Sequence, residues 1–313
     1  MRKVSGRSFA DAVQPFQVEG AGVRGRLVRL GPALDAILGA HDYPAPAAGL
    51  LAEAVTLAAL LAGAFKYDGI FTLQTQGDGP IGLMVADVTG DGAVRGYARV
   101  DRDRLARTED SAGAPVPRLL GAGNLSFTID QRLGPDRYQG LVALEGARLA
   151  ECAQSYFRQS EQLETAIIIA ENCSAGVGGP RRAAALMVQR LPPEQNVFGD
   201  FGAEDAEENW RRVVTLASSV TAAELLDEGI GPTDLLYRLF HEDGVRAYRP
   251  RPLRHACRCS RAKIEDTLRS FPRAEIERCA VAGMVEVACE FCGARYRYDE
   301  AALAELYAGA AKT

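Results

Sequence analysis

The chain has 313 residues, of which 47% are hydrophobic and 25% are charged, and its formal net charge is −5. This hydrophobic content excludes an intrinsically disordered chain, and seven cysteines are too few, and odd in number, for a disulfide-dense secreted scaffold. The N-terminal residues carry charges without an apolar core, so we expect no signal peptide. The most apolar stretch, 54–65, is too short to span a bilayer. We therefore expect a cytoplasmic protein without membrane contacts, in which clustered cysteines are metal ligands or redox thiols.

Residues 1–193 are predicted to form an α+β core domain. An apolar run rich in Ala and Leu over 44–64 indicates a helix that is buried on most sides. Short alternating runs follow it, and the Asp-Gly turns between the first of them are strong hairpin signals. The predicted strands are 70–76, 81–89, 94–100, 125–130 and 138–144.

The rest of this domain is predicted to contain a helix over 148–160, a strand over 167–170 and a helix over 182–190. The strands come in consecutive hairpins and do not alternate with helices. This order favours an antiparallel α+β arrangement over a doubly wound parallel sheet.

Residues 194–250 are predicted to be an acidic helical linker. Positions 194–245 hold three basic and twelve acidic residues, a net charge of −9. Thr221 and Glu224 have the spacing of a capping box, which predicts a helix from there to near Gly229. Helices this short are marginal in isolation, so we expect them to pack on the core domain. Undocking would then expose a sizeable apolar surface.

Residues 251–313 are predicted to be a small C-terminal metal-binding module. Two cysteine pairs lie in it, Cys257 with Cys259, and Cys289 with Cys292 followed by Gly293. A CxxC pair followed by glycine is typical of a zinc knuckle, in which glycine tolerates the positive φ of the turn. Two such pairs can supply four thiolates to one Zn²⁺ ion.

The remaining cysteines are Cys152, Cys173 and Cys279, to which the sequence assigns no role. Cys279 lies on a predicted helix after Pro272, between the two pairs. We expect it to be a small buried apolar residue and not a metal ligand.

Two details of the first pair favour a reactive site over a purely structural one. Only Arg258 separates its thiols, and His255, Arg254 and Arg261 lie close in sequence. Positive charge favours the thiolate, which is the form that oxidants attack. Structural zinc supplies about 10–16 kcal/mol of folding free energy, whereas whole domains are stable by only ~5–15 kcal/mol. Oxidation that removes the metal would therefore unfold the module, which makes an oxidation switch plausible.

At this point the sequence resembles the bacterial redox-regulated heat-shock chaperones, the 33 kDa chaperonin family. The resemblance covers nearly the whole chain, and one departure is Glu164, where the family usually has proline. The matching motifs, in chain order, are RGR at 24–26, HDYP at 41–44, LQTQGDGP at 73–80, RGYA at 95–98, YFRQSEQL at 156–163, CRCSR at 257–261, VEVACEFCG at 285–293 and YRYD at 296–299.

The resemblance implies a zinc-bound, inactive reduced state in which Cys257, Cys259, Cys289 and Cys292 hold one Zn²⁺ per chain. It implies that oxidant, usually with heat, forms Cys257–Cys259 and Cys289–Cys292 disulfides and releases the zinc. The module and the linker then unfold, and the activated homodimer holds unfolding clients without ATP. Clients pass to ATP-dependent chaperones when reducing conditions return. The protein would be no enzyme.

We expect the client-binding surface to be the apolar side of the linker helices and the face of the core domain beneath them. The expectation rests on an acidic yet amphipathic segment beside a metal-dependent fold. The linker residues assigned to this surface are Val213, Val214, Leu225, Leu226, Leu235, Leu236, Leu239 and Phe240.

Two alternatives remain open from the residues alone. A zinc-ribbon nucleic-acid binder would use the basic module and its aromatic side chains Phe271, Phe291, Tyr296 and Tyr298. Four thiolates reduce the positive charge of that module, and the adjoining acidic linker would repel phosphate, so we expect no nucleic acid. A thiol-disulfide oxidoreductase usually carries its CxxC at a helix N-terminus, whereas glycine and a Tyr-rich strand follow it here.

Overall fold

The computed structural model describes residues 9–65, 67–108, 113–131, 137–174, 179–191 and 203–308. The chain divides into two compact units, Met1–His255 and Ala256–Thr313, each of which is described by itself. Helices and largely antiparallel sheets occur together in the chain, which confirms the α+β class. The predicted linker boundaries at 193 and 250 stay predictions, and residues 192–202 lie outside the described residues.

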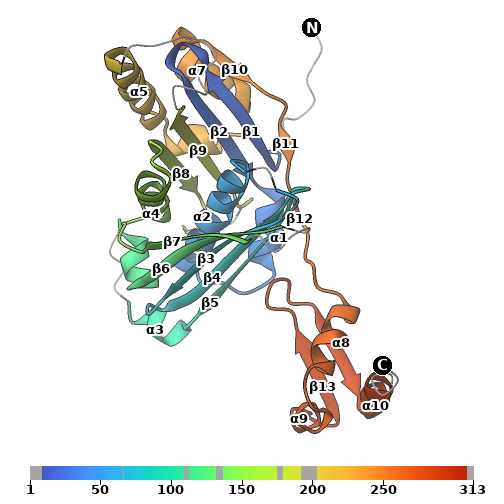
Figure 1. Ribbon diagram of the computed structural model, residues 1–313. Coiled ribbons are helices and arrows are strands. Elements are labelled where there is room, and N and C mark those ends of the chain that lie inside the picture. Colours follow the sequence, from blue (N-terminus) through green and yellow to red (C-terminus); the bar gives the residue numbers. More distant parts are fainter. Residues whose placement is uncertain are drawn as a thin grey trace. The chain divides into compact units, whose positions relative to one another are not determined.

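The first unit contains two six-stranded sheets (Figure 1). In sheet A the strand order is β10-β1-β2-β9-β8, and β11 also pairs with β1; its strands are β1 (Ala12–Val18), β2 (Val23–Leu30), β8 (Thr165–Glu171), β9 (Ala183–Arg190), β10 (Val245–Ala247) and β11 (Arg251–Pro252). In sheet B the order is β12-β5-β4-β3-β6-β7; its strands are β3 (Gly69–Gly77), β4 (Ile81–Thr89), β5 (Ala93–Val100), β6 (Gly123–Gln131), β7 (Arg137–Ala143) and β12 (Arg254–His255). Five of these strands match the hairpin strands expected from the alternating runs.

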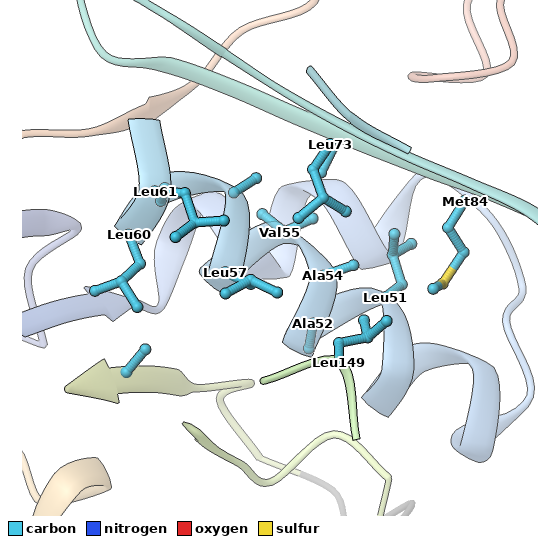
Figure 2. Close-up of a cluster of buried hydrophobic side chains, with 14 of the residues drawn as sticks. Leu51, Ala52, Ala54, Val55, Leu57, Leu60, Leu61, Leu73, Met84 and Leu149 are labelled. Carbon is cyan, nitrogen blue, oxygen red and sulfur yellow. The ribbon is translucent and has the colours of Figure 1, made fainter. Parts of the chain in front are cut away.

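Helix α2 (Ala45–Ala62) packs against both sheets and is buried from Ala47 to its end. Figure 2 shows its leucines, among them Leu51 and Leu57, meeting Leu73, Met84 and Leu149 from the surrounding elements. At 18 residues it is long and apolar enough to cross a membrane. This differs from the expectation, which took the shorter stretch 54–65 as the most apolar one and judged it too short. It is apolar on all sides because it lies between two sheets in the protein core.

Among the described residues of this unit, α5 (Ala203–Ser218) is nearly as long as α2, and the other helices are short. The short helices are α1 (Pro32–Gly39), α3 (Arg102–Ala106), α4 (Leu149–Tyr156), α6 (Ala222–Leu226) and α7 (Pro232–Phe240), with single turns η1 (Glu19–Ala21), η2 (Val116–Leu120), η3 (Phe157–Glu161) and η5 (His241–Asp243). Together α4 and η3 cover the helix expected over 148–160.

The helix predicted over 182–190 is wrong, because this segment is strand β9. It pairs with β2 on one side and β8 on the other, and residues 183–189 are all buried. A strand that is covered on both faces has no polar–apolar alternation, and its run of Ala, Leu and Met has high helix propensity. Pairing with two distant strands overrides that propensity.

Helices α5, α6 and α7 cover the face of sheet A that points away from α2, as expected for a linker docked on the core. Phe240 of α7 stacks on Phe16 of β1 with ring centroids 5.7 Å apart. The capping box of Thr221 and Glu224 is present, although α6 ends at Leu226 and not near Gly229. The helices therefore share one apolar layer with the sheet.

Glu53 is the only charged side chain of α2, and it is 4% exposed. Its carboxylate accepts a hydrogen bond from the Ala150 N–H at 3.4 Å, in the first turn of α4, where Arg148 supplies no side-chain cap. Burial raises the pKa of Glu53, although Arg148 and the α4 backbone oppose the shift. The carboxylate thus partly satisfies the N-terminus of a neighbouring helix.

We expect Glu53→Gln to become more stable relative to the wild type as pH rises. The Glu53 carboxyl binds its proton more tightly in the folded wild type than in the unfolded chain. The wild type therefore loses stability as the pH rises above 4.5, the ordinary pKa of glutamate. Glutamine has no proton to lose. Urea unfolding followed by the fluorescence of Trp210, the single tryptophan, at about pH 5 and about pH 8 measures the difference. Equal differences between the two proteins at both pH values would contradict the expectation.

The described part of the second unit, residues 256–308, contains one β-hairpin and three helices. Strands β13 (Met284–Ala288) and β14 (Arg295–Asp299) pair antiparallel, accompanied by α8 (Arg261–Arg269), α9 (Arg273–Arg278) and α10 (Glu300–Ala308). In the described part of this unit the buried apolar side chains are Leu268, Val285, Tyr298, Leu303 and Leu306. So small a core rarely stabilises a fold without a disulfide or a metal.

Candidate metal centre

Four cysteines from two separate segments meet in the second unit. Cys257 and Cys259 follow β12, whereas Cys289 and Cys292 lie in the turn between β13 and β14, and all four Sγ atoms lie within 4.8 Å of one another. The Sγ–Sγ distance is 3.7 Å between Cys257 and Cys289 and 3.4 Å between Cys259 and Cys292. Four thiolates at 2.3 Å from a tetrahedral ion would be about 3.8 Å apart. The thiols are free, and their spacing fits a tetrahedral metal site.

The turn that carries the second pair has the predicted knuckle geometry. Gly293 has a φ of 70°. Its N–H donates to the Cys289 carbonyl at 2.8 Å, and the Cys289 N–H donates to the Ala294 carbonyl at 2.9 Å. These bonds close the turn and hold both thiols on its inner side, and glycine allows the left-handed backbone that the turn needs.

The first pair is tied to the same small core. Ser260 caps α8 by accepting from the Lys263 N–H at 3.3 Å, and the Lys263 ammonium donates to the Arg258 carbonyl at 2.9 Å. The Arg261 guanidinium lies 4.8 Å from the ring centre of the buried Tyr298 and donates to the Arg297 carbonyl at 3.2 Å. Helix α8 and β14 therefore position the pair opposite the knuckle.

The thiols differ in how readily they ionise. Burial opposes ionisation of Cys257, but hydrogen bonds from the Cys259 backbone and the neighbouring thiols lower its pKa to about 7. Burial raises the pKa of Cys289, and burial together with the neighbouring thiols raises that of Cys292 to about 12. A bound cation would favour the thiolate form of the cysteines that hold it.

Metal binding to this site is expected to release at least two protons at neutral pH, from Cys289 and Cys292. Affinity should therefore rise about 100-fold per pH unit near neutrality, because each released proton contributes a factor of ten. Calorimetric titration of metal into reduced, metal-free protein, in buffers of different ionisation enthalpy, counts the protons. Release of fewer than two protons per ion would contradict the expectation.

Two of the positive side chains expected to activate the first pair, Arg254 and Arg261, are engaged elsewhere. Arg254 donates to the Asp91 carbonyl at 2.7 Å, and Arg261 packs on Tyr298. Burial lowers the pKa of His255, which favours the neutral imidazole. The low pKa of Cys257 comes instead from hydrogen bonds within the cluster, a contribution that sequence spacing does not reveal.

Among the described residues these four cysteines are the single group of His, Cys, Asp or Glu side chains with metal-ligand spacing. Cys279 is outside it, as expected, but the prediction that it is buried is wrong. It is exposed at the C-terminus of α9, a helix without buried residues, and its Sγ lies 3.5 Å from the Glu275 carbonyl. Cys152 and Cys173 are buried in the first unit, and burial raises the pKa of both.

The eight residues expected to bind clients all belong to the apolar layer between sheet A and α5–α7. Fully buried there are Val213, Leu225, Leu235, Leu236 and Phe240, while Val214, Leu226 and Leu239 are partly buried against them. A client could reach this layer only after the helices leave the sheet.

Comparison with known proteins agrees with this architecture along nearly the whole chain. Residues 11–299 match the family model described as Hsp33 protein. The 33 kDa chaperonin of Caulobacter vibrioides is 39% identical over 292 residues, which cover 92% of this chain and 95% of that protein. The 33 kDa chaperonin of Azotobacter vinelandii is also 39% identical, over 304 residues that cover 96% and 95%.

A solved structure supports the fold independently. The crystal structure of the 33 kDa chaperonin from Thermotoga maritima covers 97% of this chain and 100% of its own, with a TM-score of 0.79 at 24% sequence identity. The family-model match and the curated relatives carry the assignment beyond the fold. The chain belongs to the Hsp33 family of chaperones.

Proposed function

We propose that this protein is a redox-regulated, ATP-independent holdase, which binds unfolding or oxidatively damaged proteins after its thiols are oxidised. The observation that carries the proposal is the gathering of four free thiols at tetrahedral spacing in a unit whose described residues bury a core of five apolar side chains. That combination makes the fold of the unit dependent on the chemical state of its cysteines.

The reduced state is proposed to hold one Zn²⁺ through Cys257, Cys259, Cys289 and Cys292. A tetrahedral set of four thiolates is the typical structural zinc site, and harder oxygen-preferring ions disfavour such ligands. Bound zinc would cross-link the segment before α8 to the β13–β14 turn. The reduced, metal-bound unit is proposed to be inactive.

Oxidation is proposed to convert the four thiols into two disulfides, Cys257–Cys259 and Cys289–Cys292, a pairing that follows the family resemblance. Each pair of zinc-bound thiolates gives two electrons to one molecule of hydrogen peroxide, which takes up two protons from the solvent and yields one disulfide and two waters. Disulfide sulfurs are no longer thiolate ligands. The unit then loses its metal-dependent stability and unfolds.

Release of the linker helices is proposed to follow and to uncover the apolar layer on sheet A for clients. The activated form would be a homodimer in the cytoplasm that returns its clients to ATP-dependent chaperones under reducing conditions. The continuous packing of the eight candidate client-binding residues, five of them fully buried and three partly buried, supports this step, because their release exposes one contiguous apolar surface.

The proposal is tested by titrating peroxide into the reduced, zinc-loaded protein while counting free thiols and released zinc. The same samples are assayed for suppression of light scattering by an aggregating client. Loss of four thiols, release of one zinc and appearance of activity should coincide, and Cys279→Ser should behave like the wild type. Full activity in the reduced, zinc-loaded protein would contradict the proposal.

A further inference from the structure

Two arginines of sheet A hold the main chain of residues 224–230, here called the docked segment. Arg29 of β2 is 5% exposed, and its guanidinium donates to the carbonyls of Ile230 at 2.6 Å, Asp227 at 3.2 Å and Glu224 at 3.3 Å. Arg182, just before β9, donates to the Leu226 carbonyl at 3.3 Å. These contacts join positions far apart in the sequence.

The partners of the two guanidiniums are almost all main-chain carbonyls. They belong to the end of α6 and the loop after it, where carbonyl groups lack helical partners. One side chain takes part, Glu228, whose carboxylate pairs with Arg182 at 2.7 Å. Arg29 therefore binds the main chain of the docked segment and makes no hydrogen bond to the side chains of that segment.

A phenylalanine orients both arginines independently of the docked segment. The guanidinium carbons of Arg29 and Arg182 lie 5.2 Å and 5.3 Å from the centre of the Phe9 ring. Phe9 is 6% exposed and precedes β1, so all three residues belong to the sheet side of the contact. Cation–π stacking of this kind would keep the arginines in place after the segment leaves.

We propose that Arg29 and Arg182 form a binding site for the main-chain carbonyl groups of unfolded polypeptide, which the docked segment occupies in the closed state. The proposal rests on the holdase function proposed above. Folded proteins pair nearly all their buried carbonyls, whereas an unfolded client offers them along its whole length. The site would therefore favour unfolded chains whatever their sequence, while apolar neighbours such as Leu27 and Leu186 accept client side chains.

The docked segment then competes with the client for the same site. One substitution, Arg29→Met, should therefore have opposite effects in the reduced and the oxidised protein. In the reduced protein, Arg29→Met removes the three donors to the segment and should make its release easier. In the oxidised protein, the same change removes donors to the client and should weaken binding. Hydrogen bonds from a charged donor are the stronger kind, so we expect a loss of about tenfold in client affinity.

The experiment uses full-length, oxidised, zinc-free protein and fluorescently labelled, carboxymethylated α-lactalbumin as a permanently unfolded client. Fluorescence anisotropy gives the dissociation constant for the wild type, Arg29→Met and Arg29→Lys. Lysine keeps the charge without the guanidinium fork and should bind the client several-fold more weakly than the wild type. The control is Arg24→Met, on the same strand but on the opposite face, where Arg24 donates to Gln189 at 2.9 Å.

Weaker client binding by both Arg29 variants, with Arg24→Met like the wild type, supports the proposal. Wild-type affinity in both oxidised Arg29 variants would overturn it, even if their reduced forms released the segment more readily. If Arg29→Met lacks a cooperative unfolding transition, the client affinity of oxidised Arg29→Lys alone is the test: weaker binding supports the proposal, and wild-type affinity overturns it. Failure of the oxidised wild type to bind the client would overturn the holdase function itself, an outcome that differs from the loss of carbonyl recognition alone.

Discussion

Cys289→Ser is expected to leave the reduced protein without its bound metal and to unfold the second unit. Cys289 lies 3.7 Å from Cys257 across the cluster, so its loss removes one of the four sulfurs that join the two cysteine segments. A missing outer-shell partner already costs 10–100-fold in metal affinity, and a missing ligand should cost more than about 100-fold. The unit would lose much of the about 10–16 kcal/mol that structural zinc supplies.

Zinc content of the purified protein and hydrogen exchange of residues 256–308 measure this effect. Cys279→Ser is the matched control, because Cys279 lies in the same unit but is exposed and outside the cluster. The first unit, with its own core around α2, should keep its exchange protection in both variants. Retention of one zinc and full protection in Cys289→Ser would show that the metal site does not stabilise this unit.

Phe240→Ala is expected to release the linker helices from sheet A without any oxidant. Phe240 is fully buried at the end of α7 and stacks on Phe16 with ring centroids 5.7 Å apart. Truncating a buried phenylalanine costs ~3–5 kcal/mol, which is a large fraction of the ~5–15 kcal/mol that stabilises a whole domain. We expect the reduced variant to suppress client aggregation when the reduced wild type does not.

Limited proteolysis of residues 203–243 and the emission maximum of Trp210 in the reduced protein report the release. Trp210 is 9% exposed in the apolar layer, so undocking should shift its emission to the red. Tyr237→Ala, on the same helix but 64% exposed, should behave like the wild type. Protection equal to that of the wild type in reduced Phe240→Ala would contradict this account of the helices.

The cysteine pattern predicted the four-cysteine cluster correctly because its information is local. A CxxC pair followed by Gly293 specifies a turn whose own backbone bonds face its thiols inward, and that turn is present. The hairpin strands of sheet B were predictable for the same reason, since alternating residues and short turns pair neighbours in the chain. Local patterns of this kind do not predict the pairing of segments that are far apart in the sequence.

Strand β9 shows why such pairing cannot be read from a short run. Its Ala-rich sequence favours a helix, and only the presence of β2 and β8 on either side makes an extended, fully buried conformation more stable. Strands β1 and β2 and helix α1 were not predicted either. Cys279 is exposed because α9 is too short to bury a face, which its neighbours in sequence do not reveal.

By itself, therefore, the sequence determined the α+β class, the cysteine cluster and the amphipathic linker helices, each of which follows from spacings of a few residues. Only the tertiary structure decided where those helices lie and which groups hold them. Arg29 reaches carbonyls about 200 positions away in the chain, and no periodicity records that contact. Local spacing sets secondary structure and metal ligands, whereas the packing of distant segments places the arginines and the apolar layer on one face of sheet A.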